Sequence, residues 1–175
     1  TKTIATLGAT TYVLGSALTT MPMSLRMARV GRRRGFMAGA LINIGGCGLA
    51  VAALWLRSFP LYCLATAVIG IYNAVGLQYR FAATEVAAPA VKARAISLVL
   101  AGGIVGGFLG PAITRWGRDL FAAPFLGSFM LLAAVALVSL AVQSQVHVPK
   151  PSLAEQSGGG RPLSKIVRQP VFIVA

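Results

Sequence analysis

Polar side chains recur within an otherwise apolar stretch between residues 60 and 80. Thr66, Asn73 and Arg80 stand at helical spacing, and Tyr72 is adjacent to Asn73. Their hydroxyl, amide, guanidinium and phenol groups can form hydrogen bonds with a small molecule. Polar residues inside an apolar helix face either a cavity or a neighbouring helix. The spacing leaves both alternatives open, namely contact with a bound solute and contact with another helix.

Catalytic and metal chemistry find little support in the sequence. An enzyme site would need a nucleophile with a base, but the single histidine, His147, lies outside the apolar stretches and has no Cys, Asp or Glu nearby. Cys47 and Cys63 lie in apolar runs, where they resemble small buried hydrophobic residues more than metal ligands or a disulfide pair. We therefore expect no enzymatic activity, no cofactor and no metal site.

The elements that must position the polar groups follow from the composition. Of the 175 residues, 57% are hydrophobic and 11% are charged, and the mean hydropathy is +0.78. A soluble domain has about 25% charged residues, and a disordered chain is poor in the aliphatic residues that are abundant here. The composition therefore predicts a protein of the lipid bilayer.

Charged residues divide the sequence into five long intervals that carry no charge. The intervals contain 20 to 30 residues, and about 20 helical residues cross the hydrocarbon core of a membrane. A polar, Pro/Gly-rich cytoplasmic linker is expected at 144–170, and a further transmembrane helix is expected to begin within 171–175. The sequence thus predicts an all-α, polytopic transmembrane helical bundle over residues 1–143, with spans at 4–23, 36–56, 60–79, 95–114 and 122–143.

The basic residues predict the orientation of this bundle. Of the 16 lysines and arginines, 12 lie in alternate loops, and five of these occur between residues 26 and 34. Because cytoplasmic loops of membrane proteins carry the excess of Lys and Arg, we expect loops 24–35, 80–94 and 144–170 in the cytoplasm. Placement at membrane boundaries also argues against a nucleic-acid partner, whose site would gather basic residues on one folded face.

The basic loop that begins at Ser24 resembles the signature G-x-L-a-D-R-x-G-R-[RK], which lies between helices two and three of Major Facilitator Superfamily transporters. Its R, G, R and R/K positions are occupied by Arg29, Gly31, Arg32 and Arg33, whereas Ser24, Arg26 and Ala28 replace the glycine, the leucine and the acidic residue. Arginines that only set the topology are the alternative explanation. We predict that Glu85 pairs with Arg29, Arg32 or Arg33 when the cytoplasmic side is closed, as part of a gate.

A second motif lies on the expected helix 95–114. Gly102, Gly106 and Gly110 stand four residues apart and Pro111 follows, a pattern that favours close helix packing. The motif resembles the fifth-helix signature of exporters in the same superfamily. With the order of the loops, it implies an MFS-like N-terminal half that is incomplete, namely helices two to six, the central loop and the start of helix seven.

The resemblance implies a secondary active transporter that moves a small-molecule solute across a bacterial cytoplasmic (inner) membrane by alternating access. In that family the fourth helix lines the substrate cavity, which makes Tyr72 and Asn73 candidates, together with Thr66 and Arg80. A coupling proton or cation, if one is used, finds no Asp or Glu in the core of these spans. The helix at 122–143 is expected to face lipid. The alternative function is a non-transporting assembly or scaffold subunit.

Overall fold

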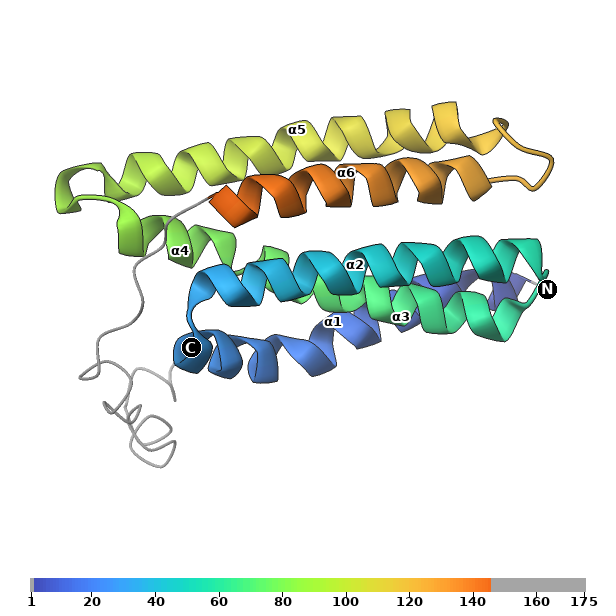
Figure 1. The fold of residues 1–175 in the computed structure, drawn as a ribbon, viewed down its shortest axis with the longest axis horizontal. Helices are drawn as coiled ribbons and strands as arrows, with labels where there is room; N and C mark the ends of the chain where they lie inside the picture. The colour runs from blue at the N-terminus through green and yellow to red at the C-terminus, as the bar shows by residue number, and fades with distance from the viewer. Residues whose placement is uncertain (1, 146–175) are drawn as a thin grey trace.

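A computed structural model describes residues 2–145, which form helices and contain no strand. The all-α class is therefore confirmed for this part of the chain. The expected linker beyond Gln145 and the expected helix start at 171–175 lie outside the described residues. The elements are α1 (Lys2–Val30), α2 (Arg32–Trp55), α3 (Phe59–Gly76), α4 (Tyr79–Val86), the 3-10 turn η1 (Pro89–Val91), α5 (Lys92–Arg118) and α6 (Leu126–Gln145), as Figure 1 shows.

Within residues 2–145, four segments are long and apolar enough to cross a membrane, and α1, which contains the expected span 4–23, is not one of them. α1 has 29 residues, but its threonines and Ser16 dilute its apolar content. The hydroxyls of Thr10 and Thr20 donate to carbonyls one turn earlier in α1, so the helix satisfies them itself. The membrane placement of α1 stays a prediction. The four segments are Arg32–Trp55, Phe59–Val86, Pro89–Arg118 and Leu126–Gln145.

Helices continue beyond the limits that the charges suggested. α3 ends at Gly76, but the next two residues keep a near-helical backbone and α4 continues to Val86, inside the expected loop 80–94. Gly31 alone separates α1 from α2. Its φ of +97° is a conformation that glycine adopts without a Cβ clash. The charged residues therefore did not predict where each helix ends, and the positions of the membrane boundaries stay a prediction.

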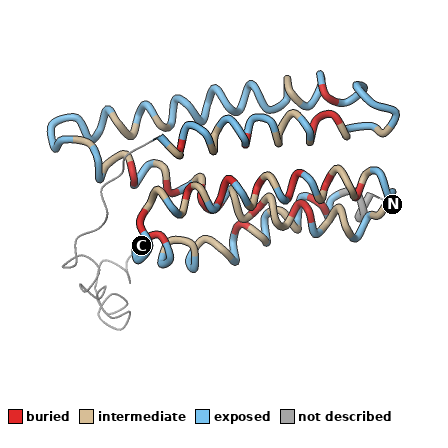
Figure 2. The backbone as a smooth tube through the Cα atoms, in the orientation of Figure 1, coloured by how far each residue is buried: buried red, intermediate tan, exposed pale blue. Residues whose placement is uncertain are grey.

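The helices form two layers (Figure 1). One layer contains α1, α2 and α3, with α3 packed against both of its neighbours, and the other contains α5 and α6. α6 packs on α2 and so joins the layers, while α4 contacts α5. Met27, Phe36, Val75 and Ala82 form an apolar core where α1, α2, α3 and α4 meet. Most of α5 is exposed (Figure 2), so part of its surface has no partner among residues 2–145.

Glycines bring α1 and α3 into close contact. A Cβ at Gly15 would lie 2.1 Å from the carbonyl oxygen of Ala67, and a Cβ at Gly70 would lie 2.1 Å from the carbonyl oxygen of Tyr12. Each helix thus presents a glycine to the backbone of the other. Close backbone approach of this kind is a main source of helix association in lipid, where hydrophobic driving force between helices is absent. We call this contact the α1–α3 seam.

The glycine motif of α5 lies in a different environment. A Cβ at Gly102, Gly106 or Gly110 would meet nothing within 4 Å, and α5 continues through Pro111 to Arg118. The motif therefore does not pack any helix of residues 2–145, contrary to the simplest form of the expectation. Its role as a packing motif stays a prediction that concerns a partner outside those residues.

Candidate functional site

Two of the four candidate cavity residues lie at the α1–α3 seam. The Thr66 hydroxyl is 2.7 Å from the Thr11 hydroxyl, and Thr66 is 8% exposed. The Asn73 amide nitrogen donates to the Ser16 hydroxyl at 3.0 Å. Thr66 is thus enclosed between helices, which agrees with contact to another helix, one of the two alternatives that the sequence left open. Asn73 is exposed, so part of its amide is accessible to a further partner.

Tyr72 and Arg80 lie away from the seam. The Tyr72 hydroxyl is 3.4 Å from the hydroxyl of Ser139 on α6. Arg80 is exposed, and its guanidinium carbon lies 5.0 Å from the centroid of the Phe81 ring, within the range of a cation–π interaction. Tyr72 and Asn73 contact different helices because adjacent residues of a helix point about 100° apart. The structure therefore does not bring the four candidates together in one site.

Arg32 joins the start of α2 to α4. Its Nη2 lies 2.7 Å from Glu85 Oε1, its Nε donates to both Glu85 oxygens, and its Nη1 donates to Gln78 Oε1 at 3.1 Å. The Arg32 side chain is 15% exposed and the Glu85 side chain is 49% exposed. Of the three arginines predicted as partners of Glu85, Arg32 is the one that pairs with it. Glu85 supplies from α4 the acidic group that the basic loop lacks at Ala28.

The other residues of the basic loop take separate positions. The Arg33 guanidinium donates to the backbone carbonyl of Ser144 in the last turn of α6. Arg29 is exposed in the last turn of α1, where a cation interacts favourably with the negative end of the helix dipole. Ser24 is half-buried. The loop residues therefore contact α4, α6 and solvent, and do not form one cluster.

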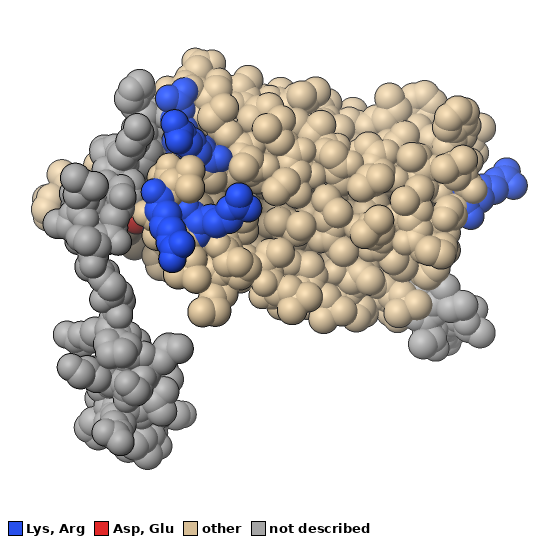
Figure 3. Space-filling model, turned by 60° about the horizontal axis from the view of Figure 1, so that its bottom comes forward, with Lys and Arg blue, Asp and Glu red and all other residues tan. Residues whose placement is uncertain are grey.

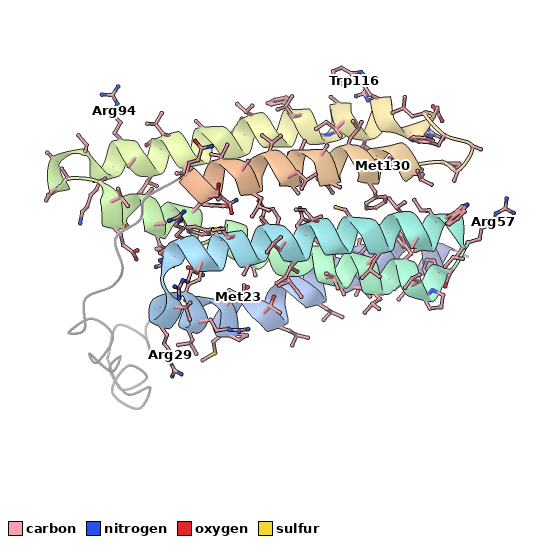
Figure 4. The ribbon with its side chains drawn as sticks, in the orientation of Figure 1. Met23, Arg29, Arg57, Arg94, Trp116 and Met130 are labelled. Carbon is pink, nitrogen blue, oxygen red and sulfur yellow. The ribbon has the colours of Figure 1, made fainter. Side chains whose placement is uncertain are left out.

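Positive charge is concentrated at one end of the bundle. On the face shown in Figure 3, most of the lysine and arginine side chains lie near one end. Figure 4 shows Arg29 and Arg94 at that end and Arg57 at the opposite end. We call these the basic end and the Arg57 end. Such an asymmetry is typical of membrane proteins that follow the positive-inside rule.

The structure contains a polar network on α6 that the sequence analysis did not predict. Gln143 Nε2 donates to the Tyr79 hydroxyl and to the Ser139 hydroxyl, both at 2.7 Å. The Tyr79 ring stacks on Phe36, with ring centroids 4.4 Å apart. One face of α6 therefore packs on α2 and reaches Tyr79 of α4. The signal was present in the sequence, because Ser139 and Gln143 stand four residues apart and share a helix face. Val135, Leu137 and Val138 on α6 are exposed, so the expectation that 122–143 faces lipid stays a prediction.

Two cavities lie between the layers, one at each end of the bundle. Their volumes are about 730 Å³ at the basic end and about 750 Å³ at the Arg57 end. The basic-end cavity is lined by residues that include Arg33, Phe36, Tyr79, Val99, Gly102 and Gln143. The Arg57-end cavity is lined by residues that include Leu54, Tyr62, Gly110, Ile113, Phe129 and Leu132. Thr66, Tyr72, Asn73 and Arg80 line neither cavity.

Comparison with known proteins identifies relatives of the chain. The Riboflavin transporter RfnT of Brucella anthropi is 38% identical, over 98% of this chain and 44% of its own length. Two MFS-type transporters of Bacillus subtilis also match: YddS at 29% identity (73% of this chain, 31% of its own length) and YdeG at 30% identity (78% and 32%). The chain thus spans less than half the length of these relatives. No solved structure matches it.

The family assignment draws on the whole chain. The sequence profile of the Major Facilitator Superfamily matches residues 1–175, and this range includes the basic loop and the glycine motif that suggested the resemblance. Four segments of the described structure are apolar enough to span a bilayer, as an integral membrane protein requires. The chain belongs to the Major Facilitator Superfamily.

Proposed function

We propose that this chain forms one helix bundle of a secondary active transporter that moves a small organic solute by alternating access. Its membership of the superfamily and its similarity to three proteins named as transporters support this function. The observation that carries the mechanism is the link from Arg32 to Glu85 and Gln78, because it joins the signature loop at the start of α2 to α4. The chain matches 44% of the length of RfnT, so a second bundle would complete the carrier.

The Arg32–Glu85 pair suits a gate that must open in every transport cycle. The Glu85 side chain is half exposed, and exposed ion pairs contribute about 0–1 kcal/mol. Such a pair can hold α4 against the start of α2 in one state and separate in the other at small cost. With the basic end in the cytoplasm, as the positive-inside rule favours, the gate closes the cytoplasmic side.

The solute contacts belong on the accessible parts of α3 and of α4, which carries Arg80. RfnT is named for riboflavin, and we infer that a small heterocyclic solute of this kind is the first candidate here. Asn73 offers an exposed amide, Tyr72 a half-buried ring on the same helix, and Arg80 an exposed cation. Thr66, which is buried against Thr11, positions α3 on α1 and affects the solute only through that packing.

The positions of the acidic residues bear on ion coupling, and the organisms of the relatives bear on the membrane in which the protein lies. The acidic residues that the structure describes, Glu85 and Asp119, lie in α4 and just after α5, away from the middle of the long helices. No group of His, Cys, Asp or Glu within residues 2–145 could hold a metal ion. A coupling carboxylate in the middle of the membrane would thus come from the rest of the carrier. Because the three relatives are bacterial, a bacterial inner membrane is the proposed location.

Solute uptake into right-side-out vesicles that contain the full-length protein tests this function. Radiolabelled riboflavin is the first solute, with and without an imposed pH gradient. We expect saturable uptake that unlabelled riboflavin competes away, and loss of uptake in Glu85→Arg. Asp119→Asn, which alters an exposed acid at the Arg57 end, is the matched control and should transport normally. No flux of any solute, together with a stable protein partner in detergent, would support the scaffold subunit.

A further inference from the structure

Asn73 has one hydrogen-bonding atom that the described helices leave without a partner. Its amide nitrogen donates to the Ser16 hydroxyl at 3.0 Å, whereas no group within residues 2–145 donates to its amide oxygen, Oδ1. Ser16 is 8% exposed and Asn73 is exposed, so the nitrogen points into the α1–α3 seam and the oxygen points away from it. An amide oxygen can only accept hydrogen bonds. Oδ1 is therefore available to a partner that supplies an N–H or O–H group.

Two hydroxyls of α1 near this amide do not supply the missing donor. The Thr20 hydroxyl donates to the backbone carbonyl of Ser16 at 2.7 Å, and the Thr19 hydroxyl donates to the carbonyl of Gly15. A hydroxyl has a single hydrogen, and here the helix backbone uses it. Thr19 and Thr20 are half-buried, and their accessible lone pairs are acceptors. The surroundings of Asn73 on α1 therefore favour a solute that donates hydrogen bonds.

The side of the helix that carries Asn73 continues with an apolar residue and then a cation. Leu77 and Arg80 follow Asn73 by four and seven residues, a spacing that places all three on one side of a helix. The backbone stays near-helical at residues 77 and 78, so Arg80 lies about 10 Å beyond Asn73. Leu77 is 45% exposed and Arg80 is exposed. This side thus presents an acceptor, an apolar patch and a group of donors, in that order.

We propose that the amide oxygen of Asn73 accepts a hydrogen bond from a ring N–H of the solute, so that the carrier selects heterocycles of the imide or lactam class. This inference rests on the function proposed above and adds the chemical group that is recognised. The flat ring covers Leu77, and hydroxyl or carbonyl oxygens at the far end of the solute accept from Arg80. Riboflavin, for which the relative RfnT is named, has an imide N–H in its ring and hydroxyls on its side chain, and so fits this order of groups.

Methylation of the imide nitrogen tests the proposal, because it removes the donor and leaves the ring intact. Binding of riboflavin and of its derivative methylated at that nitrogen to the full-length protein in detergent is followed by quenching of flavin fluorescence. We expect the methylated compound to bind the parent protein about tenfold more weakly, which corresponds to one hydrogen bond of about 1.4 kcal/mol. In Asn73→Ala the two compounds should bind equally, since the acceptor is gone.

Two further variants separate recognition from packing. Ser16→Ala removes the hydroxyl that orients the Asn73 amide, so it should narrow the difference between the two compounds, although the buried Ser16 does not reach the solute. Thr11→Ala is the matched control, because it removes a hydroxyl of the same seam that contacts Thr66 and not Asn73. It should keep the tenfold difference.

Equal binding of the two flavins by the parent protein would overturn the proposal, and this result needs no variant to fold. An undiminished difference in Asn73→Ala would also overturn it, because another group would then bind the imide. Failure of the protein to bind either flavin while it transports a different solute would refute the imide class and leave the transport function standing. Absence of flavin binding together with absence of flux for every solute tested would refute the proposed function, and this inference with it.

Discussion

Adding one methyl group at Gly70 should force α1 and α3 apart. The Cβ of Gly70→Ala would lie 2.1 Å from the carbonyl oxygen of Tyr12, whereas ordinary contact begins near 3.4 Å. Relief of the overlap requires the backbones to separate by about 1.3 Å, because two main chains meet there and no side chain can move aside. The Thr11–Thr66 bond, now 2.7 Å, would lengthen to about 4 Å, outside hydrogen-bond range.

The free energy of unfolding should fall by about 2 kcal/mol. Overpacking of a well-packed site costs about 1–3 kcal/mol. Loss of Thr11–Thr66 and of Ser16–Asn73 adds about 0.6 kcal/mol for each interhelical bond. The higher helix propensity of alanine offsets about 1 kcal/mol of this. The assay is unfolding of the 175-residue chain by SDS in mixed micelles, followed by circular dichroism.

Gly106→Ala is the matched control for this prediction. The chemical change is the same, but the added Cβ meets nothing within 4 Å. In the 175-residue chain this variant should keep its stability or gain up to about 1 kcal/mol. If Gly70→Ala unfolds at the same SDS fraction as the parent chain, the close approach of α1 and α3 at Gly70 is incorrect.

Three further outcomes test the remaining contacts. Glu85→Arg places like charges beside Arg32 and should reduce uptake at least about fivefold, equivalent to about 1 kcal/mol. The double variant with Arg32→Glu should recover part of this loss, and normal uptake in the single variant contradicts the gate. Asn73→Ala should raise the KM of uptake and should lower the free energy of unfolding in SDS less than Thr66→Ala does. An unchanged KM with a larger loss of stability than Thr66→Ala would show that Asn73 serves helix packing alone. Gln143→Leu removes two donated hydrogen bonds and should lower the free energy of unfolding by about 1–3 kcal/mol in the same titration, whereas an unchanged value contradicts the α6 network.

The helices and the partner of Glu85 were predictable from the sequence for simple physical reasons. Charge is costly in hydrocarbon, so the long charge-free stretches predicted long apolar helices, although not where each helix ends. The basic loop lacks an acid at Ala28, and Glu85 is the acidic residue in 80–94, the segment expected as the next cytoplasmic loop. Few charges leave few possible pairs, and Arg32 is found in contact with Glu85. Scarcity of charge made that contact predictable.

The faces of the helices could not be predicted in the same way. Thr66 and Asn73 share a spacing that fits a cavity and a helix contact equally well, and only the approach of α1 decides that Thr66 is buried against Thr11. The glycine motif of α5 looked like a packing site from its spacing, whereas Gly15 and Gly70, on two different helices, form the contact that the structure shows. Pairing between helices depends on tertiary geometry, which the spacing within one helix does not encode.

The seam between α1 and α3 also constrains how the protein is made. The two threonines that meet there, Thr11 and Thr66, are 55 positions apart. A ribosome that adds about 5–20 residues per second synthesises Thr11 about 3–11 s before it synthesises Thr66. During that interval α1, which is less apolar than the four other long segments, has only its own carbonyls to satisfy its hydroxyls. Entry of α1 into the bilayer should therefore wait for α3, so that the translocon releases the two helices together.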